Sequence, residues 1–367
     1  RSMMVAGKTA PMLLRFENAL VSYVLYIWKM IWPVDLAVFY PFPTGFPVWQ
    51  ILGAAIVLLA ITFMVTISAR KHAYLFVGWA WYVCTLFPAI GLVQVGLWPA
   101  MADRFVYIPL IGLFIMIVWG FHRLFGKFSF YRTMAPAALA CIAFILMSLT
   151  SLQVGFWKNS ESLFAHALKV TKGNHLAYNN LGSFYASKGE LDKALSSLEE
   201  AVRIMPDNPM FLNNMGTVLA RMGRYPRATK YLSRALELVP TYAEAYVNMG
   251  FVLSRQGKVE DANSLFRRAL EIKPLSEAHH NLGLNLARQR DLGQAIFHYK
   301  KALELRPNDP RIHNDLGVAL AQQGRIREAI SHFSEAIRLD PEYVMARHNL
   351  RAMQERTGNP AEAIKKQ

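Results

Sequence analysis

Acidic residues are almost absent from the first part of this chain. Of the 25 Asp and Glu residues, only Glu17, Asp35 and Asp103 precede residue 156, and the other 22 follow it. A region so poor in acidic residues is not typical of a protein surrounded by water. The second region, with both signs of charge, is typical of one. The composition therefore predicts two regions with different solvents.

Cysteine is also scarce, since Cys84 and Cys141 are the only two residues of this type. Both lie in apolar stretches, which favours a packing role over a disulfide, and no spacing typical of zinc ligands is present. The second region therefore has no disulfide to stabilise it, and we assign no metal. The net charge of the chain is +15, but the basic residues of the second region are interspersed with carboxylates. Nucleic acid is therefore not an expected partner.

Long apolar stretches predict a membrane domain at residues 1–153. Four stretches contain no charged residue, and we call them the clean spans; they cover residues 48–68, 73–93, 105–121 and 133–152. As helices at 1.5 Å per residue they can cross about 30 Å of hydrocarbon, the third only just. A stretch at residues 13–32 contains Arg15 and Lys29, so it is either a fifth span with these charges at the interfaces or a helix in the membrane surface. Four to five transmembrane helices are expected.

The short basic turns predict the orientation of these spans. Arg70 and Lys71 lie between the first two clean spans, and Arg123 and Lys127 lie after the third, on the same side. Basic loops remain on the cytoplasmic side of membranes. We therefore expect an integral membrane protein whose region after residue 153 lies on the extracytoplasmic side, in a periplasm or a secretory lumen.

The second region is dominated by a pattern with a period near 34 residues. Its motif glycines are Gly182, Gly216, Gly250, Gly283 and Gly317. Small residues at these slots let two helices approach closely, and larger apolar residues fill the space between helix hairpins. A second glycine marks the turn between the helices, at Gly189, Gly223, Gly257, Gly324 and Gly358. The fourth unit has Arg290 instead, which predicts a local weak point of roughly 1 kcal/mol.

This order of Gly, Ala, a large apolar residue (Phe, Tyr or Leu), Ala and Pro resembles the tetratricopeptide repeat (TPR), so residues 154–367 are expected to form a TPR solenoid. The units are a half-repeat at 157–174, full repeats at 175–208, 209–242, 243–275, 276–309 and 310–343, and a partial repeat at 344–367. The predicted fold class is all-α, with a multi-pass transmembrane helix bundle followed by an α-solenoid.

An acidic and a basic residue, Asp103 and Arg104, stand side by side before the third clean span. Arg104 is a candidate ligand for a lipid phosphate through a charge-assisted, forked contact, with Asp103 orienting it. The alternative is structural: Arg104 anchors the helix at the headgroups, and Asp103 caps its N-terminus.

The stretches ADRFVYIPLIG and WPVDLAVFYPFP, several spans, Trp157 and then a TPR array together resemble the C-terminal part of the transmembrane and TPR-containing proteins. This group is similar to protein O-mannosyltransferases of the C-type glycosyltransferase superfamily and has bacterial relatives. The resemblance implies a polyprenyl-phosphate-linked sugar donor, used on the extracytoplasmic side. It also implies a catalytic carboxylate that would lie before Arg1, so the catalytic residue is unknown and the chain is expected to be a fragment without a cofactor of its own.

A ladder of amide side chains is the candidate peptide-binding groove. It stands two residues before each motif glycine or its replacement, at Asn180, Asn214, Asn248, Asn281, Asp315 and Asn349. Amides donate and accept at once, so a stacked row could hold an extended protein chain without reading its sequence. The function is then either a lipid-linked-sugar glycosyltransferase whose array recruits protein acceptors or partners, or a non-enzymatic membrane-anchored TPR scaffold.

Two further sets of residues recur in the array. Arg221, Arg255, Arg288 and Arg356 share one slot and could favour acidic side chains of a ligand, although a solvated face is the simpler interpretation. The adjacent His279 and His280 point about 100° apart on a helix, so they do not form a chelating pair.

Overall fold

The computed structural model describes residues 11–43, 45–90, 92 and 101–356. Regular structure in these ranges is helical apart from an isolated β-bridge between Tyr40 and Met101, which confirms the all-α class. The ends of the third predicted span (residues 91 and 93) and of the partial repeat (residues 357–367, with Gly358) lie outside the described residues. Two compact units are present, residues 2–211 and 212–367, and each is described separately.

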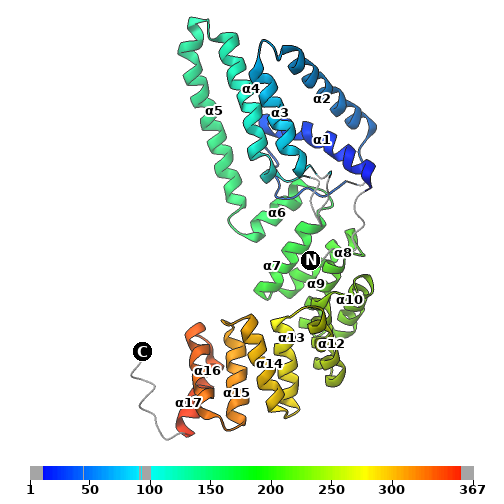
Figure 1. The fold of residues 1–367 in the computed structure, drawn as a ribbon, viewed down its shortest axis with the longest axis vertical. Helices are drawn as coiled ribbons and strands as arrows, with labels where there is room; N and C mark the ends of the chain where they lie inside the picture. Colours follow the sequence, from blue (N-terminus) through cyan, green and yellow to red (C-terminus); the bar gives the residue numbers. More distant parts are fainter. Residues whose placement is uncertain (1–10, 44, 91, 93–100, 357–367) are drawn as a thin grey trace. The chain divides into compact units, whose positions relative to one another are not determined.

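The first unit begins with helices built from the apolar stretches (Figure 1). They are α1 (Met12–Ile31), α2 (Val48–Ser68), α3 (Ala73–Leu86), η1 (Phe87–Ala89), η2 (Asp103–Phe105), α4 (Tyr107–Phe125) and α5 (Ser129–Phe156). Among the described residues, three segments are long and apolar enough to cross a membrane: Val48–Ser68, Tyr107–Phe125 and Thr133–Phe156. Helix α3 has 14 residues and spans about 21 Å at 1.5 Å per residue, so it is shorter than the predicted span at 73–93.

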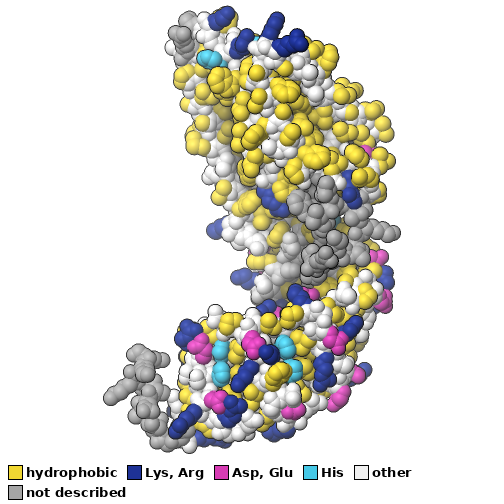
Figure 2. Space-filling view, viewed as in Figure 1, with side chains coloured by type: hydrophobic (Ala, Val, Ile, Leu, Met, Phe, Trp, Pro, Cys, Tyr) yellow, Lys and Arg dark blue, Asp and Glu magenta, His cyan; other side chains and the backbone are white. Residues whose placement is uncertain are grey.

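Helices α3 and α4 pack closely because each presents a glycine to the other. A Cβ atom on Gly78 would collide with the carbonyl oxygen of Gly112, and a Cβ atom on Gly112 would collide with that of Gly78. Large apolar side chains on α2, such as Leu59 and Phe63, are more than two-thirds exposed. Figure 2 shows hydrophobic side chains over this part of the molecule, as expected for helices that face lipid.

The remaining helices form the repeats. They are α6 (Ser160–Val170), α7 (His175–Lys188), α8 (Leu191–Ile204), α9 (Pro209–Arg221), α10 (Tyr225–Leu238), α11 (Ala243–Arg255), α12 (Val259–Ile272), α13 (Ser276–Arg288), α14 (Leu292–Leu305), α15 (Pro310–Gln322), α16 (Ile326–Leu339) and α17 (Val344–Arg356). Each full repeat contributes two helices, from α7 and α8 to α15 and α16. The α-solenoid predicted from the 34-residue period is confirmed.

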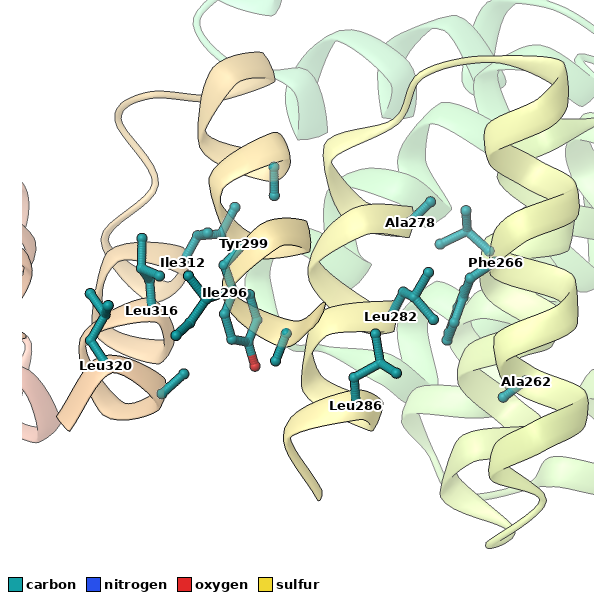
Figure 3. Packing of buried hydrophobic residues seen from close by; sticks show 14 of the residues in the cluster. Ala262, Phe266, Ala278, Leu282, Leu286, Ile296, Tyr299, Ile312, Leu316 and Leu320 are labelled. Atoms are coloured by element: carbon teal, nitrogen blue, oxygen red, sulfur yellow. The ribbon is translucent and has the colours of Figure 1, made fainter. Parts of the chain in front are cut away.

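The recurring glycines allow a large residue to lie between the two helices of a repeat. A Cβ atom on Gly283 would stand 2.7 Å from the ring of Tyr299, and one on Gly250 would stand 2.6 Å from the ring of Phe266. Figure 3 shows Phe266 and Tyr299 within the same continuous cluster of apolar side chains, which runs from α11 to α16. Each repeat thus shares its core with its neighbours.

The turns between paired helices adopt the left-handed backbone conformation that the glycine pattern predicts. Gly257 has φ 80° and Gly324 has φ 84°, and Arg290 has φ 67° at the same position of the fourth repeat. Arg290 thus carries a side chain in the left-handed region, which favours glycine, and the weak point at this turn stays a prediction.

Candidate functional site

Two loops of the first unit, residues 33–43 and 101–106, are joined by hydrogen bonds, and we call them the outer-loop junction. The backbone N–H of Tyr40 donates to the carbonyl oxygen of Met101 at 3.0 Å. The Oδ2 atom of Asp103 accepts from the backbone N–H of Ala37 at 2.6 Å and from the hydroxyl of Tyr40 at 2.8 Å. Asp103 therefore holds together two loops that are more than 60 residues apart in the sequence.

Electrostatics at the junction follow from burial. Burial raises the pKa of Asp103, while the charge of Lys29 and the hydrogen bonds from Tyr40 and Ala37 oppose this rise. Burial and the nearby Asp103 raise the pKa of Tyr40, so its hydroxyl stays protonated and can donate. No side chain caps the N-terminus of α4. The carboxylate of Asp103 is thus engaged by the other loop and not by the helix that follows it.

Arg104 lies beside this partly buried carboxylate but faces outward. Its Nη1 atom donates to the carbonyl oxygen of Val38 at 3.3 Å, and its guanidinium carbon lies 5.1 Å from the centre of the Phe105 ring. The side chain is exposed. One N–H group is used to attach Arg104 to the junction, and the others remain available to an anion at the end of the apolar helices.

The same loop also contacts the end of α5 and the first helices of the array. The carbonyl oxygen of Leu36 accepts from Nε2 of Gln153 at 3.4 Å and lies 3.1 Å from Nε2 of His166. The side chain of Asn174, which caps α7, donates to the carbonyl oxygen of Phe39 at 3.0 Å. These contacts explain why α6 to α8 belong to the same compact unit as the apolar helices, with the boundary between units inside α9.

The amide ladder divides between the two units. Asn180 lies in the first unit, is exposed, and accepts from Asn179 at 3.3 Å. Its other five members lie in the second unit and are partly buried. Each ladder residue lies on the first helix of its repeat, as the period predicts.

Neighbouring repeats of the second unit are joined by hydrogen bonds to the ladder. Nδ2 of Asn248 donates to Oδ1 of Asn213 at 2.8 Å, and Nδ2 of Asn349 donates to Oδ1 of Asn314 at 2.9 Å. Each bond joins a ladder residue to the residue that precedes the ladder position in the repeat before. These bonds fix the rotamers of the ladder amides, which reduces the entropy lost when a ligand binds.

The fourth repeat contains the exception to this pattern. Asp315 follows the pattern, because it accepts from Nε2 of His280, which precedes the ladder position of the fourth repeat, at 2.8 Å. Asn281 does not follow it, because the residue before the ladder position of the third repeat is Val247, which has no polar side chain. No hydrogen bond joins the amide of Asn281 to any of the described residues. Both the donor and the acceptor of the Asn281 amide are therefore available for an external partner.

The histidines pair with each other across helices. Nδ1 of His279 lies 2.9 Å from Nδ1 of His298, and Nδ1 of His313 lies 3.0 Å from Nδ1 of His332. Burial, together with the facing His279 and the charge of Arg267, lowers the pKa of His298 to about 4. Within the described ranges, no group of three or more His, Cys, Asp or Glu side chains could hold a metal ion.

Several contact residues were not predicted. Tyr40 meets Asp103 only in the folded chain, so no local pattern indicated it. Asn213 and Asn314 stand directly before ladder positions and are at least 94% buried. Their recurrence at the ladder spacing was visible in the sequence and could have identified them as partners of the ladder.

Comparison with protein families matches tetratricopeptide repeats at residues 182–223, 207–275, 241–308 and 280–344. The Cut9–Hcn1 hetero-tetramer of the APC/C has a similar fold, with a TM-score of 0.50 and 21% identity, over 53% of this chain and 39% of that chain. The array is therefore built of tetratricopeptide repeats.

Curated relatives extend the similarity to protein O-mannosyl-transferases. The chain is 26% identical to protein O-mannosyl-transferase Tmtc3 of Drosophila melanogaster over 223 residues, which cover 54% of this chain and 24% of that protein. It is also 26% identical to human protein O-mannosyl-transferase TMTC4 over 195 residues, which cover 50% of this chain and 26% of that protein. The chain thus spans about a quarter of the relatives that it matches.

Proposed function

We propose that this chain is the C-terminal part of a membrane glycosyltransferase that uses a polyprenyl-phosphate-linked sugar and whose array binds protein acceptors or partners. One observation carries the proposal: the loop at residues 33–43 is hydrogen-bonded both to Asp103 and to Asn174 at the start of the array. This loop connects a candidate lipid-phosphate site with a protein-binding repeat. The similarity to protein O-mannosyl-transferases supports the same assignment.

The charge distribution supports an extracytoplasmic array. Figure 1 shows the α2–α3 turn and the α4–α5 turn at the same end of the first unit, and Figure 2 shows Lys and Arg side chains gathered there. The α2–α3 turn contains Arg70 and Lys71, and the last turn of α4 contains His122 and Arg123. Basic turns favour the cytoplasmic side, so the junction and the array are assigned to the opposite side.

In this proposal Arg104 binds the phosphate of the lipid-linked donor, and Asp103 is a positioning residue. An oxygen of the acceptor hydroxyl bonds to the anomeric carbon of the sugar while the bond from that carbon to the lipid phosphate breaks. The hydroxyl proton passes to a base that is not assigned in this chain. A guanidinium that holds the departing phosphate stabilises the charge that develops on it.

The array supplies the protein-binding part of the function. Amides of the ladder bind the backbone of an extended acceptor segment, and the bonds between Asn248 and Asn213 and between Asn349 and Asn314 hold the row in place. Because backbone groups are common to all sequences, such a groove accepts many partners.

Sugar transfer by the longer protein that contains this chain tests the membrane part. With polyprenyl-phosphate-linked mannose as donor, Arg104→Ala should lower transfer by at least about tenfold, the value of one charge-assisted contact. Arg123→Ala at the other end of α4 is the matched control and should leave transfer unchanged. Equal transfer by both variants would remove Arg104 from the site. A wild-type protein that transfers no sugar but still captures peptides would favour the membrane-anchored scaffold.

A further inference from the structure

The surface of the second unit contains a cavity of about 330 Å³ between the first helices of the fourth and fifth repeats. Its wall combines apolar residues of α13 and α15 with Arg288, Arg290, Tyr299, Asp315 and Gln322. The ladder residue Asp315 is among them, so the cavity opens beside the ladder. An extended segment bound along the ladder would place one of its side chains at this cavity.

The polar groups of this cavity are mainly donors with unused capacity. Among the described residues, Arg288 makes one long hydrogen bond, from Nη1 to the hydroxyl of Ser254 at 3.4 Å, and no residue pairs with the side chain of Arg290. The acidic wall residue Asp315 already accepts from His280 at 2.8 Å and from Asn314 at 3.1 Å. The unused capacity of the cavity therefore suits an acceptor that carries negative charge.

Tyr299 adds a donor that other repeats lack. Its side chain is 1% exposed, yet its hydroxyl has no hydrogen-bond partner among the described residues. Phe266 and Phe333 fill the same slot in the third and fifth repeats and need no hydroxyl to pack against their glycines. Among the described residues, the enclosed polar side-chain atoms without a partner are those of Ser22 and His72 and do not include the Tyr299 hydroxyl, which lines the cavity. A group that enters the cavity can therefore accept a hydrogen bond from Tyr299.

We propose that this cavity binds the carboxylate side chain of an aspartate or glutamate in an extended polypeptide held by the groove. The inference rests on the proposed function of the ladder and adds a sequence preference to it. Arg288 and Arg290 supply the charge, Tyr299 donates from the base of the cavity, and Asn281 on α13 holds the backbone nearby. The negative charge of Asp315 in the wall disfavours a doubly charged phosphate relative to a singly charged carboxylate.

Peptide selection on the full chain in detergent micelles tests this assignment. The probe is a displayed library of random 12-residue peptides, and each recovered peptide that contains an acid is then made in pairs with Glu or Gln at that position. The wild-type chain should bind the Glu peptide about tenfold more tightly than its Gln partner, as expected for a hydrogen-bonded charge pair. Arg288→Gln and Tyr299→Phe should reduce this ratio. Tyr299→Phe is expected to fold, because phenylalanine occupies the slot in the adjacent repeats.

Matched variants separate the cavity from the groove. Arg255→Gln changes the same slot in the third repeat, away from the cavity, and should leave the Glu preference intact. Equal binding of Glu and Gln peptides by the wild type, or an unchanged preference in Arg288→Gln, would overturn the carboxylate site alone. If no peptide is recovered, or if Asn248→Ala and Asn281→Ala bind peptides as the wild type does, the groove itself fails, and the carboxylate site with it.

Discussion

Asp103 offers the sharpest test of how the outer-loop junction is held together. Asp103→Ala removes the acceptor of two partly buried donors, the N–H of Ala37 at 2.6 Å and the hydroxyl of Tyr40 at 2.8 Å. A buried donor without a partner costs about 1–3 kcal/mol. The Ala37 N–H can still reach the hydroxyl of Tyr40 at 2.8 Å, and this hydroxyl can still donate to the carbonyl oxygen of Asp35 at 3.0 Å, which limits the loss. We therefore expect the junction to lose about 1–2 kcal/mol, or about 5- to 30-fold in its opening equilibrium.

Hydrogen exchange measured by mass spectrometry on fragments that cover residues 34–42 reports this opening directly. Tyr40→Phe leaves the bond from Ala37 to Asp103 in place, so a loss of about 1 kcal/mol and roughly fivefold faster exchange are expected. Asp103→Asn keeps an acceptor oxygen and should change exchange less than Asp103→Ala does. Asp192→Ala, at an exposed aspartate of α8 in the same unit, is the control that should have no effect.

The pH dependence gives a second, independent signal. Burial raises the pKa of Asp103 above its value in the opened loop. The contribution of this group to stability is therefore complete below the pKa of the opened state and is lost as pH rises through the raised pKa. Asp103→Asn should remove this dependence. Exchange in residues 34–42 that is the same in the wild type and in Asp103→Ala at every pH would refute the role given to this carboxylate.

Other predictions concern the packing and the turns. Arg290→Gly should stabilise the array by about 0.5–1 kcal/mol in urea unfolding, because glycine adopts the left-handed conformation without strain, whereas Gly257→Ala should destabilise it by a similar amount. Gly112→Ala should lower the melting temperature in detergent by forcing α3 and α4 apart, at a cost of about 1–3 kcal/mol, whereas Gly53→Ala, which meets no atom within 4 Å, should not. The pKa of His298 is lowered to about 4, so the unfolded chain binds the proton more readily than the folded chain does. The stability of the array should therefore fall as the pH is lowered from about 6.5 to about 4, and His298→Gln should flatten this slope.

The parts of the fold that depend on local periodicity were predictable. Helix pairs, their turns and the close approach at Gly250 and Gly283 all follow from residues that recur at fixed spacing, and the structure agrees with each. Even the left-handed turn at Arg290 was visible as one missing glycine. The length of α3 was not predictable in this way, because an apolar composition continues to residue 93 although the helix ends at Leu86.

The candidate sites depended on contacts between distant residues. Asp103 was recognised as a charged residue at the membrane surface, but only the folded chain brings Ala37 and Tyr40 to its carboxylate. The ladder was recognised from its spacing, whereas its links through Asn213 and His280 appeared only when the first helices of adjacent repeats lay side by side.

The sequence by itself determined that this protein has an apolar helical region and a tetratricopeptide array, because hydrophobic length and a 34-residue period are properties of consecutive residues. Only the tertiary structure decided which polar groups are already paired and which remain available. Asp103 is engaged within the junction, while Arg288 and Tyr299 keep unused donors in one cavity. The physical reason is that a hydrogen bond depends on the distance and direction between two groups in space, and residues far apart in the chain acquire these only on folding.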